Sequence, residues 1–137
     1  MHNIGVVYSD KGANDEALGW CRKAMAIYER TLGTEHPVTA QMMKNIGGVY
    51  RDKGEYDEAL GWYRKALAIY EKTLGAEHPD TAATMYSIGI VYYSKGAYDE
   101  ALGWDRKVLA IRIKTLGTEH PDTTMIKSQI EAADGKP

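Results

Sequence analysis

Apolar residues recur along this chain with the spacing of an amphipathic helix. Between Gly54 and Gly75 they occupy positions 56, 59, 60, 63, 66, 67, 70 and 74, the i, i+3, i+4, i+7 ladder of one buried helix face. From Pro79 to Gly96, Met85, Ile88 and Val91 continue the same kind of pattern. The hydrophobic pattern therefore predicts one helix over about 56–74 and another over about 79–95.

Residues with known preferences for helix ends stand at the expected ends of these helices. Asp57 and Glu58 lie in the first turn, where the helix dipole favours negative charge. Gly75 follows the last apolar position, as is typical of a left-handed C-terminal cap. Pro79 suits the first position of the next helix. The pattern thus predicts a helix, a short loop and a second helix.

The same pattern repeats every 42 residues, as the positions of Trp20, Trp62 and Trp104 show. Residues 54–79 and 96–121 are identical at 20 of 26 positions, and residues 12–37 and 54–79 also at 20 of 26. Such a period indicates an array of helix pairs. The expected helices cover the N-terminus to about 11, then about 14–32, 37–53, 56–74, 79–95, 98–116 and 121–133.

We expect these helices to form one repeat domain over residues 1–133. Repeat 1 covers about 1–36 and lacks its first residues, since Met1 aligns with Met43. Repeat 2 covers about 37–78, repeat 3 about 79–120, and a closing helix about 121–133. Residues 134–137 are predicted to fray. The chain looks like a slice of a longer array, or a minimal one.

The residues Asn45-Ile46-Gly47-Gly48-Val49-Tyr50, followed by Gly54, Tyr56, Ala59, Tyr63 and Ala66, resemble the tetratricopeptide signature. The usual tetratricopeptide unit has about 34 residues. A unit of 42 with Leu74-Gly75-Ala76-Glu77-His78-Pro79-Asp80-Thr81 at its junction is similar to the repeats of kinesin light chains. The resemblance implies an all-α fold, a right-handed α-solenoid of antiparallel helix pairs whose first helices, the A helices, line a concave groove.

The composition favours a soluble protein without a nucleic-acid or membrane partner. The formal net charge is −2, and this total charge gives no indication of a basic surface. No apolar run approaches the roughly 18 residues of a membrane-spanning helix. The N-terminus lacks the features of a secretory signal. A lone cysteine, Cys21, cannot form an internal disulfide. We expect a cytoplasmic protein.

Three sets of residues suggest chemistry, and a structural reading is favoured for each. The His-Pro pairs at 36, 78 and 120 belong to successive repeats, so they cannot converge on one metal ion. The Asp-Glu pairs at 15, 57 and 99 recur at each predicted helix start, which favours a dipole role over acid–base catalysis. Cys21 replaces Tyr63 of the next repeat and is expected in the core. We predict no enzyme activity, metal or cofactor.

Two further expectations concern the second helix of each pair, the B helix. The tryptophan stripe that contains Trp62 is predicted to pack against a neighbouring repeat or junction loop. Asp105 and Arg112 replace Tyr63 and Tyr70 of the preceding repeat. These polar replacements indicate a less deeply covered face on the third B helix, as is common in terminal repeats.

The predicted function is non-catalytic binding of a peptide or protein segment in the groove. The positions on the groove side of the A helices differ between repeats, as a recognition surface would, although solvent-facing positions also drift. The resemblance implies that Asn3 and Asn45 clamp a peptide backbone, with Ser87 and Gln129 at the corresponding later positions. The candidate groove residues are Asn3, Val6, Lys44, Asn45, Arg51, Tyr86, Ser87, Ile90 and Tyr93.

The alternative function is a self-associating array that stacks through its end repeats and so forms a homo-oligomer. An uncapped repeat end exposes an apolar face that a second copy could cover. The residues expected in such a contact are Ile4, Val7, Tyr8, Ile126 and Ile130. The sequence does not identify a partner for either function.

Overall fold

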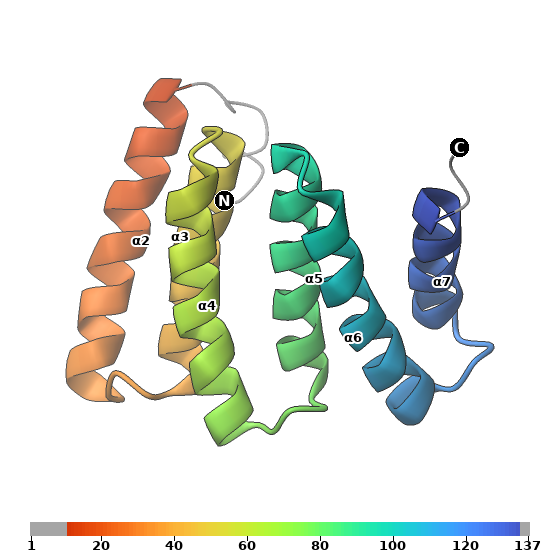
Figure 1. Cartoon of the computed structure of the whole chain (residues 1–137). Coiled ribbons are helices and arrows are strands. Elements are labelled where there is room, and N and C mark those ends of the chain that lie inside the picture. Colours follow the sequence, from red (N-terminus) through yellow and green to blue (C-terminus); the bar gives the residue numbers. More distant parts are fainter. Residues whose placement is uncertain (1–10, 135–137) are drawn as a thin grey trace. The chain divides into compact units, whose positions relative to one another are not determined.

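A computed structural model of the chain describes residues 11–134 and shows six helices in them, with no strand in that range (Figure 1). The helices are α2 (Lys11–Thr31), α3 (Pro37–Asp52), α4 (Tyr56–Thr73), α5 (Pro79–Lys95), α6 (Tyr98–Leu116) and α7 (Pro121–Asp134). Each helix packs against its neighbour in the chain within two series, α2–α3–α4 and α5–α6–α7. The all-α fold of consecutive helix pairs is confirmed.

The chain divides into two compact units, of which unit 1 ends at Thr73 and unit 2 begins at Leu74. Unit 1 contains α2, α3 and α4, and unit 2 contains α5, α6 and α7. The single domain over 1–133 stays a prediction. The first predicted helix, up to about residue 11, lies outside the described residues, as does most of the tail.

Five of the six helices lie within a residue of their predicted bounds, and α2 is the exception. It begins at Lys11, so Gly12 is helical, whereas the equivalent Gly54 and Gly96 end helices with φ values of 79° and 81°. The earlier start moves Asp15 out of the first turn of α2. Its carboxylate instead accepts a hydrogen bond of 3.0 Å from Lys53 Nζ. The predicted dipole role of the acidic pair therefore fits the other two B helices only.

A glycine brings α3 and α4 close together in unit 1. A Cβ added at Gly47 would lie 3.0 Å from the Tyr63 ring and 3.3 Å from the Ala59 carbonyl oxygen. Tyr63 is 2% exposed and fills the space between the helices. Ala59 and Ala66, one turn before and after it on α4, are fully buried. Small residues on both helices thus leave room for one buried aromatic ring.

The α5–α6 pair of unit 2 has the same glycine but a different filling residue. Gly89 takes the place of Gly47, and a Cβ there would lie 2.8 Å from Asp105 Oδ1. Asp105 is 1% exposed. The expectation that this residue marks a poorly covered face is therefore wrong. Its position in the repeat decides its burial, and Arg112, two turns further on, is half-buried.

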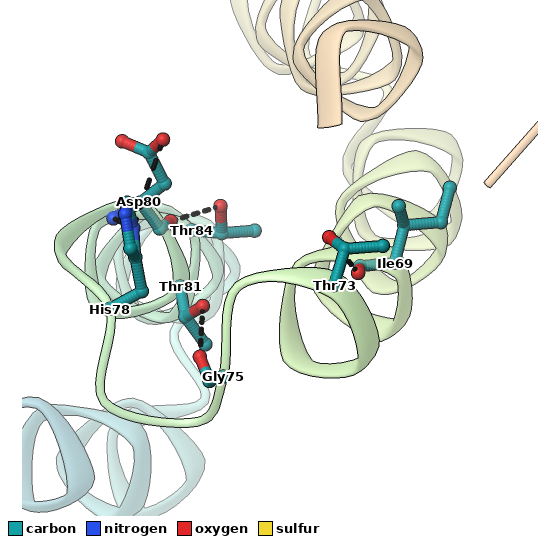
Figure 2. A network of polar contacts seen from close by, with 7 residues as sticks. All are labelled: Ile69, Thr73, Gly75, His78, Asp80, Thr81 and Thr84. Carbon is teal, nitrogen blue, oxygen red and sulfur yellow. Dashed lines mark hydrogen bonds and ion pairs between the residues drawn. The ribbon is translucent and has the colours of Figure 1, made fainter. Parts of the chain in front are cut away.

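The His-Pro pairs cap the helices that follow them. The imidazole Nδ1 of His36, His78 and His120 accepts the backbone N–H two residues ahead, at 3.1, 3.0 and 3.1 Å. Each bond satisfies one N–H at a helix start that has no partner within the helix. Figure 2 shows His78 directed at the Asp80 backbone in this way. The structural role predicted for these histidines is confirmed.

A buried threonine near the start of the following helix donates a further hydrogen bond at each junction. Thr39 Oγ1 donates to the Gly33 carbonyl at 2.8 Å, and Thr81 Oγ1 donates to the Gly75 carbonyl at 2.7 Å (Figure 2). Thr123 donates to the Arg112 carbonyl at 3.3 Å, further back along α6. Each threonine is at most 1% exposed. Thr39 and Thr81 thus tie the start of their own helix to the preceding loop, at a glycine with positive φ, whereas Thr123 ties α7 to α6.

The helix α7 resembles α3 and α5 on only one of its sides. Thr123, Ile126 and Ile130 are buried, so this side packs within unit 2. On the side where α3 and α5 meet their own B helix, α7 carries exposed Thr124, Lys127 and Glu131. The residues at these three positions are Ala40, Met43 and Gly47 in α3, and Ala82, Met85 and Gly89 in α5. The outer side of α7 is therefore polar, as in a capping helix.

The packing of Tyr63 against Gly47 predicts a large effect of truncation. Tyr63→Ala should lower the free energy of unfolding by about 3–5 kcal/mol, because it empties a buried aromatic site. The exposed Glu71 of the same helix is the control, and Glu71→Ala should change it by about 0.5 kcal/mol or less. Urea unfolding of both variants measures the difference. Equal effects would contradict the assignment of the buried face.

The junction bonds predict that two buried threonines of α5 differ in their contribution. Thr81→Val removes the bond to the Gly75 carbonyl, which keeps only a longer 3.3 Å bond from the His78 N–H, and should cost about 1 kcal/mol. Thr84 donates to the Asp80 carbonyl of its own helix, so Thr84→Val should cost less. Urea midpoints of the two variants compare them. A larger loss for Thr84→Val would show that the junction bond is not the stabilising one.

Candidate functional site

The candidate residues of α3 lie on one side of that helix in unit 1. We call Lys44, Asn45, Gly48, Arg51 and Asp52 the α3 strip. Asn45 is exposed, and its side chain makes no hydrogen bond within residues 11–134. Arg51 forms a 3.6 Å ion pair with Asp52. Among residues 11–134 the amide of Asn45, which is both a donor and an acceptor, thus has no hydrogen-bond partner, and cationic side chains flank it.

The hydroxyl of Tyr63 lies beneath the α3 strip. A Cβ added at Gly48 would be 3.6 Å from this oxygen. Because Gly48 has no side chain, α3 carries no side-chain bulk over the Tyr63 hydroxyl at this position. Burial raises the pKa of Tyr63, while Arg51 partly lowers it and Asp52 raises it further. The Tyr63 hydroxyl is therefore protonated and adds no charge to the α3 strip.

The candidate residues of α5 form a different surface in unit 2, and we call Tyr86, Ser87, Ile90, Tyr93 and Ser94 the α5 strip. All but Ser94 are half-buried. The Tyr86 hydroxyl accepts a hydrogen bond of 3.2 Å from Gln129 Nε2 of α7. Arg112 lies over the Tyr86 ring at 5.4 Å. The α5 strip is thus more aromatic than the α3 strip, and its first tyrosine already has partners.

Ser87 and Tyr93 of the α5 strip also make contacts within the unit. Ser87 Oγ donates to the Ala83 carbonyl of its own helix at 3.1 Å. The Tyr93 ring packs against Tyr98 with a centroid separation of 6.0 Å. Ser87 stands where α3 has Asn45, but it does not offer an equivalent free amide. Backbone recognition of the kind that Asn45 could provide is therefore not repeated on α5.

Several predicted residues fall outside the described range or inside the core. Asn3 and Val6 of the groove set, and Ile4, Val7 and Tyr8 of the self-association set, lie outside residues 11–134. Ile126 is fully buried and Ile130 is 8% exposed. Both therefore pack within unit 2, and a second copy meeting α7 would contact other side chains.

The residues that suggested chemistry do not assemble into a reactive site. Among the described residues, no three of the His, Cys, Asp and Glu side chains are grouped as a metal site would require. Cys21 is half-buried rather than fully buried, and burial raises the pKa of its thiol. A raised pKa keeps the thiol protonated and weakens it as a nucleophile.

The tryptophans differ in exposure from one repeat to the next. Trp62 is half-buried, with the Arg22 guanidinium of α2 at 5.9 Å from its ring and Lys65 Nζ at 4.7 Å. The predicted packing of this stripe against the adjacent repeat fits Trp62. Trp20 is 67% exposed, and Ile27, two turns along α2, is 50% exposed. The start of the stripe in unit 1 is therefore an open apolar surface.

Sequence reasoning missed two features of these surfaces. Arg112 covers Tyr86 and its Nη1 donates to the Asp122 carbonyl at 3.3 Å, so it ties α6 to both neighbours. Gln129, noted only as a replacement for asparagine, binds Tyr86. The replacement of Tyr70 by Arg112 could have indicated the contacts of Arg112. The bond between Gln129 and Tyr86 could not be predicted without knowing how α7 packs.

Comparison with solved structures supports the fold. The chain matches a protein from Podosopora anserina assigned as a kinesin light chain with nearly identical TPR-like repeats, at 29% identity and a TM-score of 0.80. The match covers 98% of this chain but 65% of that one, so the chain spans less than two thirds of its relative. A single-substitution form of the same protein gives a TM-score of 0.79. BtubC (BKLC) from P. vanneervenii, at 23% identity, 96% coverage of this chain and 54% of that one, shares the fold with a TM-score of 0.78.

The remaining results concern curated protein sequences, membrane-spanning helices and family profiles. No curated protein sequence matches the chain. None of the helices between residues 11 and 134 is long and apolar enough to cross a bilayer. The sequence profile described as Tetratricopeptide repeat matches residues 1–72 and 39–114, which is most of the chain. With the 42-residue period, the helix pairs and the kinesin-light-chain-like neighbours, this match shows that the chain belongs to the tetratricopeptide-repeat family.

Proposed function

We propose that the chain is a non-catalytic protein-interaction module that binds an extended polypeptide segment on its A helices. Tetratricopeptide repeats in general mediate protein–protein interactions and are not enzymes. The observation that carries the proposal is Asn45, an exposed amide without an intramolecular partner among the described residues, on the family's groove position. An asparagine can bind both the N–H and the C=O of a peptide backbone. We place this activity in the cytoplasm, as a scaffold.

The two strips, one in each unit, favour different chemical groups of a bound polypeptide. Lys44 and Arg51 give the α3 strip a cationic character, partly offset by Asp52. Ile90, Tyr86 and Tyr93 give the α5 strip an apolar character. Backbone contacts and acidic side chains therefore suit α3, whereas aliphatic or aromatic side chains suit α5. Asn3 and Val6, which lie outside the described residues, belong to the same proposal.

The second candidate function, self-association, is favoured by the open surface of α2. In repeat 2, Ile69 is 6% exposed and Trp62 is half-buried, whereas the equivalent Ile27 and Trp20 are 50% and 67% exposed. A second copy that covered this surface would remove apolar area from water. The polar outer side of α7 makes a poor complement for it, so an end-to-end array built through α7 is the less favoured form.

Peptide selection tests the binding proposal. A phage-displayed library of linear peptides should yield binders, and Asn45→Ala should weaken them by about tenfold or more, because a buried backbone partner would lose its hydrogen bonds. The melting temperature should not change, since Asn45 makes no bond within the described part. Glu71→Ala, on the exposed side of α4, is the matched control. Tyr86→Ala is a poor choice because it also removes contacts with Arg112 and Gln129.

Sedimentation tests the alternative. If copies associate through α2, the wild-type chain should form oligomers that Trp20→Ser dissociates and Asn45→Ala leaves intact, because Trp20 belongs to the apolar surface of α2 and Asn45 does not. Trp20→Ser should keep the fold, as two thirds of the side chain is already in water. A chain that stays monomeric at all concentrations would exclude this function.

A further inference from the structure

The carboxyl group of Asp105 occupies a place in α6 that a charged group does not suit. The residue is 1% exposed, and neither carboxylate oxygen has a hydrogen-bond partner of good geometry among residues 11–134. Its Oδ1 lies against Gly89, 2.8 Å from where a Cβ would be. An ionised carboxylate is unfavourable in such a buried place, whereas a neutral carboxylic acid is tolerated.

The same place in unit 1 shows what Asp105 replaces. There the filling residue is Tyr63, whose hydroxyl lies 3.6 Å from a Cβ added at Gly48. In unit 2 the two positions hold Asp105 and Ile90, so the bulk has moved from the B helix to the A helix. The exchange puts a titratable carboxyl group where unit 1 has a neutral phenol. The two units thus form an internal comparison.

The charged and titratable groups near Asp105 only partly compensate for its burial. Burial raises the pKa of Asp105, and the Tyr93 hydroxyl of α5 and the Arg112 guanidinium of α6 lower it in part. Arg112 is directed toward the Tyr86 ring of α5 and the Asp122 carbonyl of α7 rather than toward the carboxylate. The pKa stays above its ordinary value of 3.8.

We propose that unit 2 contains a proton-operated latch, in which the neutral carboxyl group of Asp105 packs α6 against Gly89 of α5 and its ionisation loosens that contact. Proton linkage determines how the stability of unit 2 changes with pH. A carboxyl whose pKa is raised on folding stabilises the folded state fully below its unfolded pKa, near 3.8, and loses this stabilisation as the pH rises through the folded pKa. Within that window the opening equilibrium of α5 and α6 grows by up to about tenfold per pH unit.

Hydrogen exchange of the full chain from about pH 4 to about pH 8 tests the latch. Exchange rates are divided by the intrinsic rates at each pH, which leaves the opening equilibrium. Peptides from α5 and α6 should open more readily as the pH rises. Peptides from α3 and α4, where Tyr63 stands in place of Asp105, should change much less. Equal pH dependence in both units would overturn the proposal.

Two variants separate the latch from a general effect of pH. Asp105→Asn keeps the shape without the charge, so α5 and α6 should lose their pH dependence and open less at neutral pH. If that variant does not fold, Asp105→Tyr with Ile90→Gly rebuilds the packing of unit 1 and should give the same result. Conversely, Tyr63→Asp with Gly48→Ile should confer pH dependence on α3 and α4. A variant without Asp105 that keeps the wild-type pH dependence would exclude the latch.

Discussion

Both helix pairs depend on a close approach of two backbones at a glycine of the A helix. At Gly47 and Gly89 no side chain separates the A helix from the carbonyl of an alanine on the B helix, Ala59 or Ala101. The residue on the next turn of the B helix, Tyr63 or Asp105, then packs against the glycine. A side chain at Gly47 would crowd the Tyr63 ring and the Ala59 carbonyl oxygen, and one at Gly89 would crowd the Asp105 carboxyl group, because packed interiors have few voids to absorb it.

The helix ends could be read from the sequence because their determinants are local. Glycines at the C-termini, prolines at position N1 and the spacing of apolar residues each act within one or two turns. The early start of α2 could not be read in this way, because Gly12 is identical to Gly54 and Gly96 yet lies in a helix. Identity between repeats therefore does not by itself fix a helix end.

The sequence predicted which candidate side chains share a helix face, but not whether each of them is engaged in contacts within the chain. The helical period placed Asn45 and Tyr86 on the expected sides of α3 and α5, and whether each is available for a ligand depends on side chains elsewhere. Tyr86 is bound by Gln129, 43 residues away, and such a contact arises only once α7 has packed. Polarity was also a poor guide to burial at Asp105, where the repeat position decides. Thr81 was passed over because its acceptor, six residues away, is brought near by the loop.

The one-sided character of α7 has a consequence for how such an array can change in length. A duplicated 42-residue unit placed ahead of Pro121 would present to α7 a surface like the one it covers now. A unit appended after α7 would instead place a new B helix on Lys127 and Glu131, where α3 and α5 carry methionine and glycine. Growth by duplication, whether in evolution or by design, is thus easier in the interior of the array than beyond α7.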